Sequence, residues 1–182
     1  MLRFPLTAAC LLAFSLTSKE GYAWALGLFL LACLSDFLDG FLARRMNVIS
    51  AFGKLWDPIA DKFLTLGCFT LFSMKHIMPW WALIIIAGRE ILLTVIRVHY
   101  SKKYGTVFAA LSLGKLKTVI QMVFISFVFI MFTAYEFVPI DTKYRFAQIT
   151  TVGTGILLFA TVMITLISGA EFFLKNDLKV KQ

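Results

Sequence analysis

Four aspartates, Asp36, Asp39, Asp57 and Asp61, lie close together at the ends of two apolar segments. Residues three or four apart share one face of a helix, so these residues form two pairs, 36/39 and 57/61. Four carboxylates in one apolar pocket would repel one another, and burial would protonate most of them. A divalent cation removes this conflict, and carboxylate oxygens suit Mg²⁺, Mn²⁺ or Ca²⁺. Four carboxylates are enough for a site with two metal ions.

The residues around the aspartates extend this interpretation to a phosphate-bearing ligand. Gly40, beside Asp39, has no side chain, so another group can approach the backbone closely. Arg44 can donate to an anionic phosphate through its planar guanidinium. The alternative is that the aspartates are interfacial charges paired with neighbouring basic residues. Four acids on helical faces, with glycine and arginine at fixed offsets, favour the metal site.

The rest of the sequence indicates the elements that must position these residues. The chain has 182 residues, of which 60% are hydrophobic, and its net charge is +8. Soluble domains are about 45–50% apolar, so this composition indicates an integral membrane protein. Long continuous apolar runs favour helices over strands. We expect an all-α protein whose single domain, residues 1–182, has six transmembrane helices at about 4–17, 21–43, 55–75, 78–99, 108–134 and 145–174.

Lysine and arginine placement predicts how these helices are oriented. Most basic residues flank one set of segment ends, which include Arg44, Lys54 and Lys103, whereas the opposite loops carry few. Basic loops face the cytoplasm. We therefore expect a multi-pass protein of the cell membrane, with both termini and the aspartates on the cytoplasmic side. The basic residues suit an anionic lipid surface, and no pattern of a nucleic-acid-binding protein is present.

A family resemblance accompanies the aspartates. The pattern Asp36-x-x-Asp39-Gly40-x-x-Ala43-Arg44, followed after eight residues by Gly53-x-x-x-Asp57-x-x-x-Asp61, resembles the signature of the CDP-alcohol phosphotransferase family. The resemblance implies that family's fold, and two Mg²⁺ or Mn²⁺ ions held by the four aspartates. It implies that Asp61 is also the catalytic base. Gly40, Arg44 and Ser50 would bind the cytidine diphosphate part of a lipid donor, CDP-diacylglycerol. Relatives by this resemblance are homodimers, so a homodimer is expected.

Basic residues in the second half indicate the acceptor. Arg89 lies inside an apolar segment, which is costly and marks a functional candidate. Arg97, Lys115 and Lys117 follow, and several cations near one anionic pocket favour an acceptor with its own phosphate. The strings GRE…R and GKxKTxxQ resemble the phosphatidylglycerophosphate synthase branch, whose acceptor is glycerol 3-phosphate. We therefore expect Arg89, Arg97 and Lys115 to bind that phosphate. The alternatives are an ion pair of Arg89 with Glu90 or a contact with a carbonyl of another helix, and membrane anchoring by Arg97.

Two other functions stay open from the sequence. The same chemistry could use another acceptor: inositol phosphate, serine or phosphatidylglycerol. A divalent-cation transporter could instead use the aspartates as a selectivity site. Such a transporter needs charged residues along a continuous path, whereas here the acids lie mainly on one side of the membrane. Transfer of a phosphatidyl group to glycerol 3-phosphate, with release of CMP, is therefore the favoured function.

Overall fold

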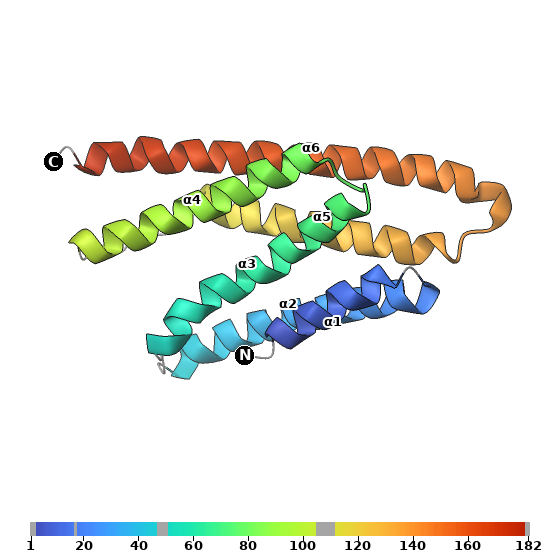
Figure 1. The fold of residues 1–182 in the computed structure, drawn as a ribbon, viewed down its shortest axis with the longest axis horizontal. Helices are drawn as coiled ribbons and strands as arrows, with labels where there is room; N and C mark the ends of the chain where they lie inside the picture. The colour runs from blue at the N-terminus through green and yellow to red at the C-terminus, as the bar shows by residue number, and fades with distance from the viewer. Residues whose placement is uncertain (1–2, 17, 47–50, 105–111, 181–182) are drawn as a thin grey trace.

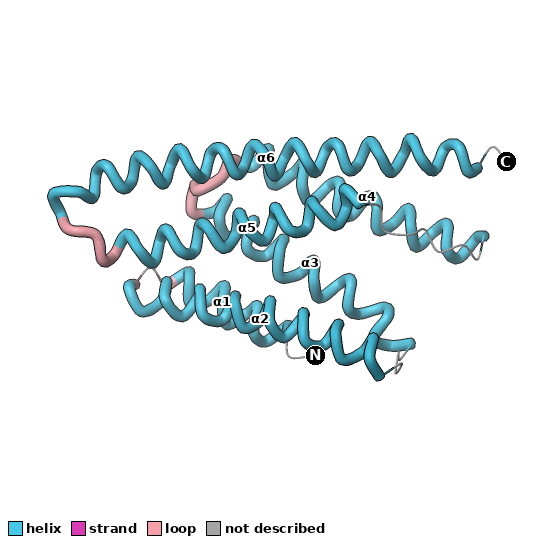
Figure 2. The backbone as a smooth tube through the Cα atoms, turned by 180° about the vertical axis from the view of Figure 1, so that it is seen from behind, coloured by secondary structure: helices cyan, strands magenta, loops and turns pink. Residues whose placement is uncertain are grey.

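The chain forms a bundle of helices in the computed structural model, as the sequence predicted. The structure describes residues 3–16, 18–46, 51–104 and 112–180; of these, residues 3–4, 36–37, 39–46, 51–61, 97–104, 112 and 175–180 are described by their backbone alone. The described residues contain no strand, and their helices are shown in Figure 1 and Figure 2. Each predicted apolar segment corresponds to one helix: α1 (Arg3–Ser15), α2 (Lys19–Met46), α3 (Ala51–Met74), α4 (Trp80–Tyr104), α5 (Ser112–Tyr135) and α6 (Ile140–Val180).

Local hydrogen bonds explain two of the helix ends. Ser18 precedes α2, and its Oγ accepts the N–H of Gly21 at 3.0 Å, which is the usual N-cap contact. After α3, the N–H of Ile77 donates to the carbonyl of Phe72 at 2.8 Å. His76 lies between them with a left-handed φ of 57°. This arrangement is a Schellman motif, with histidine at the position where glycine is commonest.

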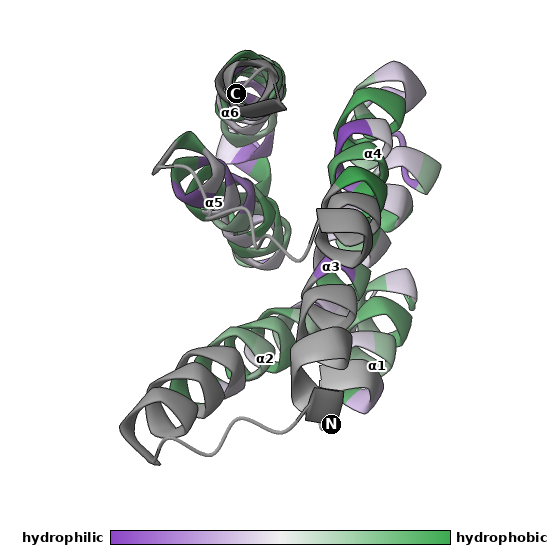
Figure 3. Ribbon diagram, turned by 90° about the vertical axis from the view of Figure 1, so that its left-hand side faces the viewer, coloured by the Kyte–Doolittle hydropathy of each residue, from purple (hydrophilic) through white to green (hydrophobic). Residues whose placement is uncertain are grey.

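The helices pack around an aromatic core. Helix α1 packs against α2 and α3, α2 also packs against α5, and α4 and α5 both pack against α6. Figure 3 shows α1 and α2 on one side of the bundle and α5 and α6 on another. The completely buried Phe14 ring lies 5.0 Å from Phe129, 5.4 Å from Phe132 and 5.7 Å from Phe72 between ring centroids. These contacts fix the short helix α1 against α3 and α5.

The described helices have the length and composition of a membrane protein. Two stretches are long and apolar enough to cross a bilayer, Leu113–Tyr135 in α5 and Ile140–Leu174 in α6, in a search confined to the described residues. Large apolar side chains such as Leu12, Ile84 and Ile156 are exposed on the outside of the bundle. Association with a membrane follows from these features. The expectation of six spans stays a prediction.

Candidate active site

The two aspartate pairs lie on successive helices. Asp36 and Asp39 lie in α2, and Asp57 and Asp61 lie in α3, so each pair has the helical spacing on which the predicted metal site depends. The C-terminal end of α2 and the N-terminal end of α3 lie at the same end of the molecule (Figure 1). The aspartate side chains are outside the described part of the structure. Their convergence on one pocket therefore stays a prediction.

The chemistry of this donor set fits the metals that the sequence predicted. The aspartates offer oxygen ligands from two helices, and hard oxygen ligands are preferred by Mg²⁺ and Mn²⁺. Within the side chains that the structure describes, no group of three or more His, Cys, Asp or Glu could hold a metal. The predicted nucleotide-binding residues Gly40 and Arg44 also lie in α2, whereas Ser50 lies outside the described residues.

Charged side chains gather in the interior around Glu90 of α4, which is 7% exposed. Its Oε1 accepts hydrogen bonds from Arg89 Nη1 at 3.3 Å and from Lys117 Nζ of α5. Its backbone carbonyl accepts a hydrogen bond from Lys62 Nζ of α3 at 3.2 Å. We call Lys62, Arg89, Glu90 and Lys117 the Glu90 cluster. The cluster joins three helices through one residue, and Lys62 follows directly after Asp61 in the sequence.

Helix α6 contributes the contact that holds Arg89 from another side. Arg89 Nη2 donates to Ser168 Oγ at 2.9 Å, and Ser168 Oγ donates in turn to the carbonyl of Thr165 at 3.1 Å. A Cβ atom at Gly169 would lie 3.5 Å from Arg89 Cγ, so the arginine side chain runs closely along α6. Glu171 lies three residues after Ser168, hence on the same helical face. Arg89 is therefore fixed between α4 and α6.

The structure describes some of the basic residues that the sequence grouped as an acceptor site, and the grouping itself stays a prediction. Arg89 makes the ion pair with Glu90 that was the alternative to an acceptor contact, so its role toward an acceptor stays a prediction. Lys115 is exposed, whereas Lys117, two residues later, is 5% exposed and paired with Glu90. Arg97 lies in α4, and its side chain is outside the described set. Of these cations, the described contacts bring together Arg89 and Lys117.

Sequence reasoning did not assign Glu90, Lys62 or Ser168 to a site. Glu90 is a carboxylate inside an apolar segment and stands beside Arg89, and such a residue is a functional candidate by the same argument. From the sequence, Lys62 counted as a charge that orients the protein, as a possible ion-pair partner of the aspartates and as part of the string ADK that fits the synthase branch, without a role in a site. Ser168 gave no signal, because 79 residues separate it from Arg89 and a single serine does not indicate its partner.

An apolar groove opens beside the Glu90 cluster, between α1, α3 and α4. Its walls include Leu11, Leu66 and Val95, and Lys62 and Thr94 also line it. Thr94 Oγ1 donates to the same Glu90 carbonyl that Lys62 contacts, at 2.6 Å. We call this feature the lateral groove. Through Lys62 it adjoins the charged cluster.

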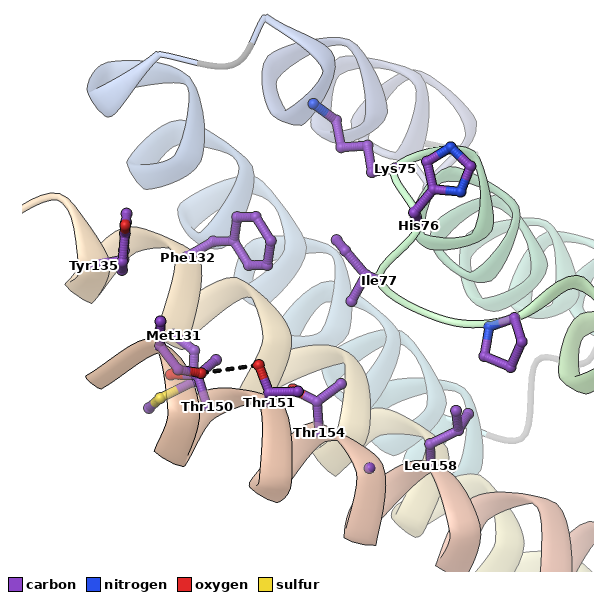
Figure 4. Close-up of a pocket in the computed structure, with 13 residues that line it drawn as sticks. Lys75, His76, Ile77, Met131, Phe132, Tyr135, Thr150, Thr151, Thr154 and Leu158 are labelled. Atoms are coloured by element: carbon purple, nitrogen blue, oxygen red, sulfur yellow. Dashed lines mark hydrogen bonds between the residues drawn. The ribbon is translucent and has the colours of Figure 1, made fainter. Parts of the chain in front are cut away.

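A second cavity lies far from the aspartates along α3. Figure 4 shows residues that line it, among them Lys75 and His76 of the α3–α4 turn, Phe132 of α5 and Thr154 of α6. The turn follows the C-terminal end of α3, whereas Asp57 and Asp61 lie in the N-terminal half of that helix. Lys75 comes 14 residues after Asp61, which corresponds to about 21 Å along a helix. This cavity is therefore separate from the candidate active site.

Apolar helices with paired aspartates at adjoining ends and cations in their interior are what we expect of a membrane enzyme that acts on phosphate-bearing substrates. The chain belongs to the CDP-alcohol phosphatidyltransferase family, whose sequence profile matches residues 1–167. The resemblance noted from the aspartate pattern is thereby confirmed.

Individual relatives confirm the branch that the sequence indicated. The chain is 34% identical over 149 residues to the CDP-diacylglycerol–glycerol-3-phosphate 3-phosphatidyltransferase of Bacillus subtilis, covering 82% of this chain and 71% of that protein. It is 46% identical over 101 residues to the protein of the same name from Mycoplasma genitalium, covering 55% and 42%. A probable phosphatidylglycerophosphate synthase of Mycobacterium tuberculosis is 33% identical over 150 residues, covering 82% and 63%.

Proposed function

We propose that this protein transfers a phosphatidyl group from CDP-diacylglycerol to glycerol 3-phosphate, giving phosphatidylglycerophosphate and CMP. The observation that carries this proposal is the family match over residues 1–167, together with relatives named for that reaction. The aspartate pairs on α2 and α3 and the buried cations between α3, α4 and α5 are the features such a reaction needs.

In this proposal the aspartates hold two divalent ions, Mg²⁺ or Mn²⁺. When bound, the ions neutralise charge on the diphosphate of the donor. Asp61 accepts the proton of the acceptor hydroxyl as that oxygen attacks the phosphorus that carries the diacylglycerol. Gly40, Arg44 and Ser50 hold the cytidine diphosphate part, with Gly40 allowing close approach and Arg44 donating to phosphate oxygens.

Cations hold the phosphate of glycerol 3-phosphate. Arg89, Arg97 and Lys115 are the residues that the sequence assigned to this role. The position of Arg89 supports it, because the guanidinium lies in a cluster that also contains Lys62, the residue next to Asp61. Charge-assisted hydrogen bonds to a phosphate are about twice as strong as those between neutral groups.

The membrane arrangement belongs to the same proposal. All six helices cross the cell membrane, and the aspartates face the cytoplasm, where the nucleotide part of the donor and glycerol 3-phosphate are available. The lateral groove supports this arrangement, since apolar walls between α1, α3 and α4 suit the acyl chains of a lipid donor. The protein acts as a homodimer.

The test is CMP release by purified protein with CDP-diacylglycerol and a panel of acceptors. Glycerol 3-phosphate should support release, and serine, inositol phosphate and phosphatidylglycerol should not. Chelation of divalent ions should stop release, and added Mg²⁺ or Mn²⁺ should restore it. Release with a different acceptor would reassign the reaction within the family, and release that survives chelation would remove the metals from it.

Asp61→Asn tests the proposed base. General-base catalysis contributes about 10²–10⁴-fold, so CMP release should fall by at least about 10²-fold at saturating metal. Glu136→Asn is a suitable comparison, because Glu136 lies in the turn after α5, outside all the proposed roles. Near-normal release by Asp61→Asn would show that another group takes the proton.

A further inference from the structure

We infer that Glu90 is a positioning residue that holds the cations of its cluster in place for the phosphate of the acceptor. This inference rests on the proposed function and adds to it a carboxylate that neither the family pattern nor the acceptor residues assigned above include. It predicts that Glu90 acts on the recognition of the phosphorylated acceptor and leaves the recognition of the lipid donor unchanged.

Glu90 contacts cations through both its side chain and its backbone. Its carboxylate contacts cations from two sources, Arg89 on its own helix and Lys117 on α5. Its backbone carbonyl holds Lys62 on α3. The side chains of Glu90 and Lys117 are 9% and 6% exposed, so the protein, rather than water, determines where these charges lie. One residue thus sets the positions of three cations from three helices.

Buried cations need such a residue because they repel one another and lose their hydration. Within the described contacts, two cations face the Glu90 carboxylate and a third, Lys62, contacts its backbone carbonyl, while Glu171, on the face of α6 that carries Ser168, is a second acid. Full ionisation of these five groups leaves one net positive charge. A phosphomonoester carries up to two negative charges, and an uncharged alcohol carries none. The cluster is therefore suited to a phosphorylated acceptor.

Glu90 could instead compete with the phosphate for the same cations, and the two roles predict opposite effects. A competing carboxylate lowers the affinity for the acceptor, so its removal would lower the KM for glycerol 3-phosphate. A positioning carboxylate orients Arg89 and Lys117, so its removal raises that KM. The contact of Arg89 with Ser168 favours positioning, because a second group on α6 fixes the same guanidinium at 2.9 Å.

Glu90→Gln tests the inference, since glutamine keeps the size and an oxygen acceptor but removes the charge. A displacement of about 1 Å in a positioning group can lower the reaction rate by up to about 10²-fold. We expect the KM for glycerol 3-phosphate to rise about 10- to 100-fold, with the KM for CDP-diacylglycerol changed less than about twofold. Glu90→Asp, which restores the charge, should recover part of the loss. Glu136→Gln, a carboxylate outside the cluster, is the matched control and should match the unmodified protein.

Ser168→Ala is a second test that leaves every charge in place. It removes the hydrogen bond that holds Arg89 from α6, so the KM for glycerol 3-phosphate should rise several-fold without a change for the lipid donor. If Glu90→Gln does not yield folded protein, Ser168→Ala tests the inference in its place. An unchanged KM for glycerol 3-phosphate in Ser168→Ala would then overturn the inference. In folded Glu90→Gln, a lowered or unchanged KM for that acceptor, or an equal rise for both substrates, would also overturn it.

The unmodified protein separates this inference from the function on which it rests. If it releases no CMP with glycerol 3-phosphate, the proposed function fails. If it does so and the variants show no selective change in KM, the function stands and the role of Glu90 fails.

Discussion

The Glu90–Lys117 pair should be energetically coupled, and a double-mutant cycle can measure the coupling. Lys117→Met removes the ammonium and keeps an apolar chain of similar length, and Glu90→Gln removes the carboxylate charge. Both side chains are less than a tenth exposed, so breaking the pair leaves a buried charge without its partner. Removal of one partner of a buried ion pair costs about 3–5 kcal/mol.

The remaining contacts of each residue refine this magnitude. In Lys117→Met, Arg89 Nη1 still lies 3.3 Å from Glu90 Oε1, and at an effective dielectric constant of about 20 this attraction is about 5 kcal/mol before desolvation. The loss should therefore fall near the lower bound, about 3 kcal/mol. Glu90→Gln keeps a hydrogen-bond acceptor and should cost about 2 kcal/mol. The double variant removes both charges of the pair, so neither charge is left buried without its partner. Its free energy of unfolding should fall by about 2–3 kcal/mol, which is less than the sum of about 5 kcal/mol for the two single variants.

The free energy of unfolding can be measured in detergent micelles by titration with a denaturing detergent, followed by helical circular dichroism. Lys115→Met is the matched control: it removes a lysine two residues away that is exposed, and should change stability by less than about 0.5 kcal/mol. If the losses of the two single variants add to within about 0.5 kcal/mol, the two residues are independent and the buried pair does not form.

Two further predictions concern packing and use the same unfolding titration. Gly21→Ala should lower the free energy of unfolding by about 1–3 kcal/mol, because a Cβ there would lie 2.6 Å from the carbonyl oxygen of Ala13. In Gly27→Ala, in the same helix, the new Cβ meets nothing within 4 Å, so the free energy of unfolding should rise by at most about 1 kcal/mol. Equal effects would contradict the close packing of α1 on α2. Phe14→Leu should cost about 2 kcal/mol through lost ring contacts, whereas Phe173→Leu, at a position that is 50% exposed, should cost less than about 0.5 kcal/mol. An equally small loss at Phe14 would show that the aromatic core does not hold α1.

The helices could be predicted from the sequence because the signal for each is local. Long apolar runs separated by short polar stretches gave all six, and Pro79 and Pro139 precede the starts of α4 and α6. The left-handed His76 was not predicted, because a histidine does not indicate that conformation in the way a glycine does. Helix ends that depend on one backbone torsion are therefore less predictable than helix interiors.

The pairing of helices could not be predicted, because it depends on contacts between residues distant in sequence. The order of packing places α6 against α4, and only this contact brings Ser168 to Arg89. For the same reason, the sequence indicated Lys117 as a possible ligand of a phosphate, whereas in the structure Lys117 pairs with the Glu90 carboxylate. The aspartate pattern was informative because its spacing lies within single helices.

Lys62 is a described residue that belongs both to the lateral groove and to the Glu90 cluster. It lines the lateral groove between α1, α3 and α4, whose apolar walls suit lipid chains. Its ammonium contacts the Glu90 carbonyl, at the cluster that suits a phosphorylated, water-soluble acceptor. Lys62 also follows directly after Asp61, the proposed base, in helix α3. An enzyme that joins a lipid donor to a soluble acceptor needs a place where both meet, and the proposed function puts that place where α3 packs against α1 and α4.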